Sequence, residues 1–232
     1  MGTDAELALG VSLGRIDGRV TRDEALAHVR IIATATDCPV SADLEKGFGD
    51  APADVAETIR LAAAAGVVGG SIEDFTGDKD KPFYDLGLAV ERVTAAVEAA
   101  RGLAFPFTLT ARTENFVWGN PSLDDTIRRL QAFERAGADV LFAPGLPDLA
   151  SVAAVCAAVS KPVNFMVGIR GKSFSVADLV AAGVHRISLA TSLYRAAMSG
   201  LVNAAREVKE RGTFSYVDQV LTSAEMGAFL KG

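Results

Sequence analysis

Two carboxylates stand one residue apart, Asp43 and Glu45, at the end of a short apolar run and just before a glycine-rich turn. Alternation along a strand would place both side chains on one face, with Leu44 on the other. Two like charges this close repel each other unless a cation or a cationic substrate lies between them. A hard divalent ion with oxygen ligands is the natural partner. This stretch therefore predicts one side of a metal site.

Two further charged clusters end apolar runs in the same way. Glu73 and Asp74 follow a run that starts at Val67, and Arg112 follows a run that starts at Phe107. We expect these strand ends to converge on one site. Two roles stay open: Asp74 either joins the site or caps its loop, and Arg112 either binds substrate or forms a structural ion pair with Glu114.

The composition suits a soluble globular protein. The chain has 232 residues, of which 50% are hydrophobic, with a formal net charge of −6 and a pI near 5.0. One domain covering residues 1–232 can bury a large core at this length. The acidic balance argues against nucleic-acid binding, which would need a basic surface. Charges interrupt every apolar run and the first residues lack the features of a signal peptide, so we expect a cytoplasmic protein without a membrane partner.

Proline and glycine divide the chain into repeating units. Strands that open after a proline alternate with strands that follow an Ala-Gly helix end, and this pattern predicts βα units with a parallel sheet. One helix is predicted from a Thr21–Glu24 capping box. The strands are expected in the run that ends at Glu45 and at 67–72, 107–112, 139–143, 163–167 and 184–189. The remaining helices are expected from residue 52 to Gly66, at 86–101, from 124 to Gly137, and at 148–159, 175–181 and 191–210, with a terminal helix within 213–231.

The three charged clusters all lie at the carboxyl ends of predicted strands, which is where (β/α)₈ barrels carry their chemistry. Such a barrel needs eight strands, and only six are predicted. We therefore expect either a barrel that lacks one or two strands at its N-terminus or an open α/β sheet.

Several segments, taken together and in this order, resemble the isocitrate lyase / phosphoenolpyruvate mutase superfamily. They are Val40–Gly49, Gly70–Asp74, Thr110–Glu114, Ala136–Gly145, Lys161–Asn164 and Gly183–Ser188. The resemblance runs from about Ser12 to about Leu230. It implies a (β/α)₈ barrel of the phosphoenolpyruvate-binding type with an extra C-terminal helix. It also implies a homo-oligomer, a tetramer or a dimer, in which partners exchange that helix.

The resemblance also implies roles for particular residues. Asp43, Glu45 and Glu73 would hold Mg²⁺, mostly through water. Arg112 and Glu114 would be catalytic, and Arg112 would pair with the substrate carboxylate or with the developing oxyanion. Asn164 would add a further polar contact to the substrate, and segment 75–84 would be a mobile lid. Mg²⁺ keeps several waters and needs few carboxylates, and a guanidinium fork fits a carboxylate. The implied reaction is carbon–carbon cleavage of a small, oxaloacetate-like 2-oxo acid through an enolate.

Two departures from the family leave alternatives open. The lid sequence Phe75–Lys81 has no cysteine, which disfavours isocitrate-type cleavage, and it has lysines but no asparagine, which leaves a phosphonate mutase unsupported. Met1–Leu9 matches neither the first strand nor the serine-rich turn that binds anions in the family. The alternatives are a phosphorus–carbon enzyme and an impaired member whose activity is weak unless another segment closes the barrel.

Overall fold

Residues 20–229 are described in a computed structural model, so sequence expectations that fall on residues 1–19 and 230–232 lie outside the described part. The chain divides into two compact units, Met1–Ser192 and Leu193–Gly232. The single-domain prediction stays a prediction. No helix within residues 20–229 is both long and apolar enough to cross a membrane.

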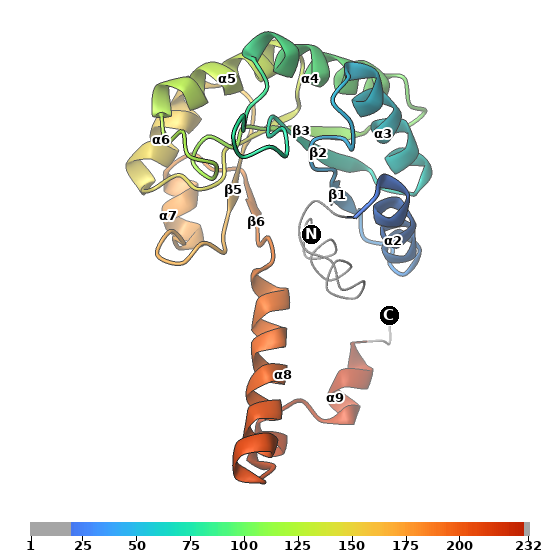
Figure 1. Cartoon of the computed structure of the whole chain (residues 1–232), viewed down its shortest axis with the longest axis vertical. Helices are drawn as coiled ribbons and strands as arrows, with labels where there is room; N and C mark the ends of the chain where they lie inside the picture. The colour runs from blue at the N-terminus through green and yellow to red at the C-terminus, as the bar shows by residue number, and fades with distance from the viewer. Residues whose placement is uncertain (1–19, 230–232) are drawn as a thin grey trace. The chain divides into compact units, whose positions relative to one another are not determined.

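The first unit is built around a six-stranded parallel sheet (Figure 1). Each strand pairs with its neighbours in the sequence, in the order β1 to β6. The strands are β1 (Ser41–Asp43), β2 (Gly69–Glu73), β3 (Thr108–Arg112), β4 (Val140–Phe142), β5 (Val163–Met166) and β6 (Arg186–Ser188). This is the strand order of a (β/α)₈ barrel, and the sheet is open between β6 and β1 in the described residues. The predicted incomplete barrel is therefore confirmed.

Helices alternate with these strands and form an arc around their outer side (Figure 1). They are α2 (Arg22–Thr34), α3 (Pro52–Ala64), α4 (Leu86–Arg101), α5 (Leu123–Arg135), α6 (Leu149–Ala158) and α7 (Val176–Ala181). The second unit comprises most of α8 (Ser192–Arg211), the short 3₁₀ helix η1 (Ser215–Gln219) and α9 (Ser223–Ala228).

The helix boundaries follow local sequence signals. Thr21 and Glu24 form the predicted capping box at the start of α2. Gly66, Gly137 and Gly183 follow helix ends with φ near +100°, a conformation that favours glycine. At Gly183 the space is also restricted, because a Cβ there would lie 2.9 Å from Cβ of Cys156.

The core lies between the helices and the outer face of the sheet. Along β3, Leu109 and Ala111 face this core and are fully buried, while Thr110 and Arg112 alternate with them. Ile59 on α3 and Phe133 on α5 pack against the same outer face from the two core clusters. Each fully buried large apolar side chain contributes roughly 1.5–3 kcal/mol. Since most apolar positions face outward, polar side chains make up much of the inner face, with Phe142 among the apolar exceptions.

One local prediction was wrong. The strand that carries Asp43 ends at that residue, and Glu45 lies in a turn with φ +48° rather than on the strand. Strand alternation therefore does not place Glu45 beside Asp43. The turn does so instead, because Asp43 Oδ1 accepts a hydrogen bond from the Glu45 backbone N–H at 2.9 Å.

Candidate active site

Three carboxylates surround one guanidinium at the carboxyl ends of β1, β2 and β3. Arg112 Nη1 lies 2.9 Å from Asp43 Oδ2 and 3.4 Å from Glu73 Oε2. Arg112 Nε donates to Glu114 Oε1, two residues further along the chain. The strand register explains the meeting, since Glu73 pairs directly with Arg112 and Asp43 pairs with Ser71 on the strand between them. The predicted convergence of strand ends is what the structure shows.

Glu45 adjoins this cluster through its backbone and its charge. Its carbonyl accepts a hydrogen bond from the Glu73 backbone N–H at 3.0 Å, which ties the turn after β1 to the end of β2. Its carboxylate is near enough to contribute to the raised pKa of Glu73. The left-handed backbone at a non-glycine residue costs on the order of 1 kcal/mol, so this tie holds the turn in a conformation it would not adopt alone.

The cluster contains three carboxyl groups and one guanidinium. Burial is the main cause that raises the pKa of Glu73, and Arg112 acts in the opposite direction. Burial likewise raises the pKa of Glu114. Burial alone would lower the pKa of Arg112, but the charges of Glu114, Glu73 and Asp43 outweigh it and raise that pKa above its ordinary value. Burial therefore favours the protonated forms of Glu73 and Glu114, while the charge of Arg112 favours their ionised forms.

This donor set fits a hard cation bound mainly through water. In residues 20–229 no three His, Cys, Asp or Glu side chains are arranged to ligate one ion directly. The acids nevertheless supply only oxygen donors, and buried Glu114 Oε2 has no hydrogen-bond partner in the described part of the chain. Mg²⁺ keeps several of its waters and uses one or two carboxylates. Asp43, Glu45 and Glu73 are the residues that would hold it.

Asp74, whose role was left open, forms its side-chain hydrogen bonds with groups other than Arg112. Its carboxylate accepts from Thr113 Oγ1 at 2.8 Å, from the Glu114 backbone N–H at 3.0 Å and from Arg129 Nη1 at 3.1 Å. Burial raises the pKa of Asp74, and these hydrogen bonds act against the shift. Asp74 therefore caps the loop after β3 and so positions Glu114.

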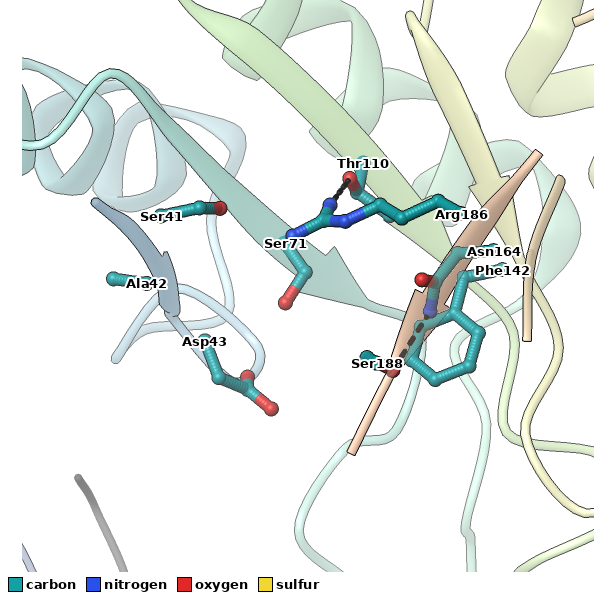
Figure 2. A pocket seen from close by; sticks show the side chains of 9 residues that line it. All are labelled: Ser41, Ala42, Asp43, Ser71, Thr110, Phe142, Asn164, Arg186 and Ser188. Atoms are coloured by element: carbon teal, nitrogen blue, oxygen red, sulfur yellow. Dashed lines mark hydrogen bonds between the residues drawn. The ribbon is translucent and has the colours of Figure 1, made fainter. Parts of the chain in front are cut away.

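Asn164 lies on β5 at the edge of a pocket inside the barrel (Figure 2). Its Nδ2 donates to Ser188 Oγ at 3.1 Å, and its buried Oδ1 has no hydrogen-bond partner between residues 20 and 229. The pocket also contains Asp43, so the predicted substrate residue and a predicted metal residue share it. The polar side chains that line it include Asp43, Ser71, Thr110, Asn164, Arg186 and Ser188.

Four of these side chains, those of Ser71, Thr110, Arg186 and Ser188, were not predicted as site residues from the sequence. Ser71 and Thr110 stand two residues before Glu73 and Arg112 on the same strands, and alternation could have found them. Arg186 stands in a predicted strand, where a charge is unusual, and that was the signal available for it.

A buried arginine outside the cluster fixes the turn after β1. Arg92 on α4 is 1% exposed and donates to the carbonyl oxygens of Lys46, Gly49 and Asp50. The aromatic ring of Tyr84 lies 4.2 Å from its guanidinium carbon. The turn that positions Glu45 is thus held by charge-assisted hydrogen bonds.

The predicted lid, residues 75–84, packs on the loop after β3. Phe75 and Phe83 form an antiparallel bridge within it. The ring of Phe75 stacks on Trp118 with centroids 4.2 Å apart, and Lys79 Nζ lies 5.6 Å from the same indole. Lys46 Nζ donates to the Thr76 carbonyl at 2.7 Å, which links the lid to the turn after β1. The mobility of the lid stays a prediction.

Known proteins match this chain over most of its length. The family model described as phosphoenolpyruvate phosphomutase matches residues 4–209. The 2-methylisocitrate lyase of Escherichia coli (strain K12) is 30% identical over 225 residues, which cover 93% of this chain and 75% of that protein. The oxaloacetate decarboxylase of Bradyrhizobium diazoefficiens is 30% identical over 212 residues, which cover 89% of this chain and 71% of that protein.

A solved structure from Burkholderia cenocepacia J2315, described only at the level of lyase/mutase, is 48% identical. The two structures superpose with a TM-score of 0.95, and the match covers 100% of this chain and 83% of the Burkholderia chain. The chain belongs to the isocitrate lyase / phosphoenolpyruvate mutase superfamily. Its relatives support an enzyme of the carbon–carbon lyase class.

Proposed function

We propose that this chain is a Mg²⁺-dependent carbon–carbon lyase that acts on a small 2-oxo carboxylic acid of the oxaloacetate type. The observation that carries the proposal is the cluster of Asp43, Glu73 and Glu114 around Arg112 at the strand ends. The names of the similar lyase and decarboxylase support the reaction class.

Arg112 can bind substrate while it stays in the cluster. Its Nε and Nη1 have carboxylate partners, and Nη2 has none among residues 20–229. Nη2 is thus available to a substrate carboxylate, and the side chain is already oriented by the acids. Charge-assisted hydrogen bonds of this kind are roughly twice as strong as hydrogen bonds between neutral groups.

A bound metal ion and Glu114 would stabilise the negative charge and hold a proton during the reaction. A bound Mg²⁺ would supply Lewis-acid stabilisation of the negative charge that develops on the oxo acid. Glu114 Oε2 is buried without a hydrogen-bond partner among the described residues, so it can hold a proton near that charge. The Phe75–Lys81 lid has no cysteine to act as an acid. A substrate whose cleavage leaves CO₂ or another stable fragment suits this site better than an isocitrate.

The test is a panel of oxaloacetate, 2-methylisocitrate and phosphonopyruvate, each with Mg²⁺ and with a chelator. A protein-free Mg²⁺ sample corrects for spontaneous loss of oxaloacetate. We expect Mg²⁺-dependent turnover of oxaloacetate that falls about 100-fold or more in Asp43→Ala. Asp85→Ala is the matched control, since Asp85 is exposed and makes no cap hydrogen bond.

Absence of Mg²⁺-dependent turnover would refute this function, and so would equal turnover by Asp43→Ala and the wild type. Calorimetry with Mg²⁺ alone separates a failure of metal binding from a wrong choice of substrate.

A further inference from the structure

Arg186 is a cation in the pocket without a counter-charge. Its Nη1 donates to Thr110 Oγ1 at 3.3 Å, and no carboxylate within residues 20–229 pairs with it. Two other buried arginines near the strand ends are paired, since Arg112 on β3 contacts three acids and Arg129 on the surrounding helix α5 contacts Asp74 and Asp125. Arg186 is therefore the guanidinium that remains available in this pocket.

The environment of Arg186 is costly for a lone charge. Its side chain is half-buried, and burial lowers its pKa with no opposing acid. A guanidinium cannot lose its proton at ordinary pH, so the charge persists and requires either water or an anion. An anion entering the pocket would relieve this cost.

Neighbouring side chains supply the donors that such an anion needs. Figure 2 shows the Arg186 side chain reaching across the pocket, with its guanidinium between Thr110 and Ser71. Ser188 and Asn164 line the same pocket. Hydroxyl hydrogens can rotate toward an anion. Asp43 lines the opposite side, so the pocket has an acidic end and a cationic end.

We propose that Arg186 is a second anion-binding residue, and that the substrate carries a second anionic group at the end remote from its oxo-acid group. This inference rests on the proposed function, which places the oxo-acid group at Asp43, Glu73 and Arg112. The remote group is a carboxylate or a phosphonate, because both match a guanidinium fork with flanking hydroxyls. Arg186 thereby selects dianionic over monoanionic oxo acids.

The test uses three unreactive 2-hydroxy acids that differ only at the remote end. They are malate, 2-hydroxy-3-phosphonopropanoate and 2-hydroxybutyrate, titrated calorimetrically with Mg²⁺ present. The variants are Arg186→Met and Arg186→Lys, and Arg30→Met on the exposed side of α2 is the control.

We expect the wild type and Arg30→Met to bind at least one dianion about 10-fold or more tightly than 2-hydroxybutyrate. Arg186→Met should remove this preference and leave 2-hydroxybutyrate affinity unchanged. Arg186→Lys should keep part of the preference for dianions. Lysine retains the positive charge but lacks the planar guanidinium that binds an anion through two parallel hydrogen bonds. The dianion whose affinity falls more between the wild type and Arg186→Met identifies the remote group as a carboxylate or a phosphonate.

The ligand-free melting temperature separates binding from structure. Arg186→Met should melt at or above the wild-type temperature, because it removes a half-buried charge that has no acidic partner among residues 20–229. If Arg186→Met unfolds, the comparison uses Arg186→Lys. The inference is overturned if the wild type does not prefer a dianion, or if the variants lose both affinities in parallel.

The two proposals fail separately. Dianion preference that depends on Arg186 without turnover of any oxo acid would refute only the proposed function. Turnover of oxaloacetate without such a preference would refute only the role of Arg186.

Discussion

Arg112 Nη1 and Asp43 Oδ2 lie 2.9 Å apart, which joins the end of β3 to the end of β1 across the intervening strand. The same nitrogen lies 3.4 Å from Glu73 on that intervening strand. A guanidinium thus stands between carboxylates where a cation was expected. A divalent ion that binds these acids must share them with Arg112, so the arginine and the metal are coupled.

Replacing Arg112 by Met should destabilise the fold by about 3–5 kcal/mol, the usual result of leaving buried charges without their partner. Asp43, Glu73 and Glu114 would each lose an ion pair in a buried site. Urea denaturation at pH 7 measures the change. The double variant Arg112→Met/Glu114→Gln should recover part of the loss, because one uncompensated acid is removed. An Arg112→Met protein as stable as the wild type would contradict this view of the cluster.

Glu73→Gln should stabilise the metal-free protein at neutral pH. The pKa of Glu73 in the folded state is raised well above the ordinary value of 4.5 for a glutamate, mainly by burial. Its favourable contribution is therefore complete below the unfolded pKa and is lost as the pH rises through the folded pKa. The free energy of unfolding of the variant, relative to that of the wild type, should therefore increase from about pH 4.5 upward. A rise in melting temperature of roughly 2–4 °C at pH 8 would correspond to about 1 kcal/mol.

Thermal melts in a chelator between pH 4 and pH 8 measure this difference. Exposed Glu98→Gln on α4 is the control, and its difference from the wild type should stay constant with pH. Adding Mg²⁺ should stabilise the wild type and not Glu73→Gln. A Glu73→Gln protein less stable than the wild type at pH 8 without metal would show that the carboxylate is not penalised by burial.

Much of the fold could be predicted because its signals are local. Capping at Thr21, glycines after helices and short apolar runs all depend on neighbours in the sequence. Convergence of Asp43, Glu73 and Arg112 could be predicted as well, because carboxyl ends of parallel strands meet at one edge of a sheet.

Orientation and counter-charges could not be predicted, because they depend on residues distant in the sequence. Asp74 and Glu73 are adjacent, yet Arg129 and Thr113 hold Asp74 outside the cluster. Arg186 became informative only when the structure placed it beside Thr110, 76 residues earlier in the chain. The turn at Glu45 likewise depends on its contact with Glu73.

Phe75→Ala should loosen the predicted lid and weaken substrate binding. The stack on Trp118 is the lid's aromatic contact with the loop after β3, and such a pair contributes roughly 0.5–1.5 kcal/mol beyond its buried area. We expect KM to rise about 2- to 10-fold with a smaller change in kcat. Trp118 is the only tryptophan of the chain, so its fluorescence reports the stack directly. Ligand titrations followed by fluorescence measure both effects, and Phe105→Ala in the exposed turn after α4 is the control.

The exposed apolar side chains of the second unit indicate that the protein associates with copies of itself. Ten large apolar side chains between Leu193 and Phe229 are not buried by their own unit, and α8 has no buried residue. A monomer rarely exposes so much apolar surface, and such patches mark interfaces. We therefore expect a homo-oligomer, a dimer or a tetramer, whose mass light scattering measures during gel filtration. Phe214→Glu combined with Leu221→Glu should shift the mass toward the monomer, while Glu210→Ala, equally exposed on α8, should not. A wild type that stays monomeric at micromolar concentration would contradict the prediction, because the exposed side chains would then need no partner copy.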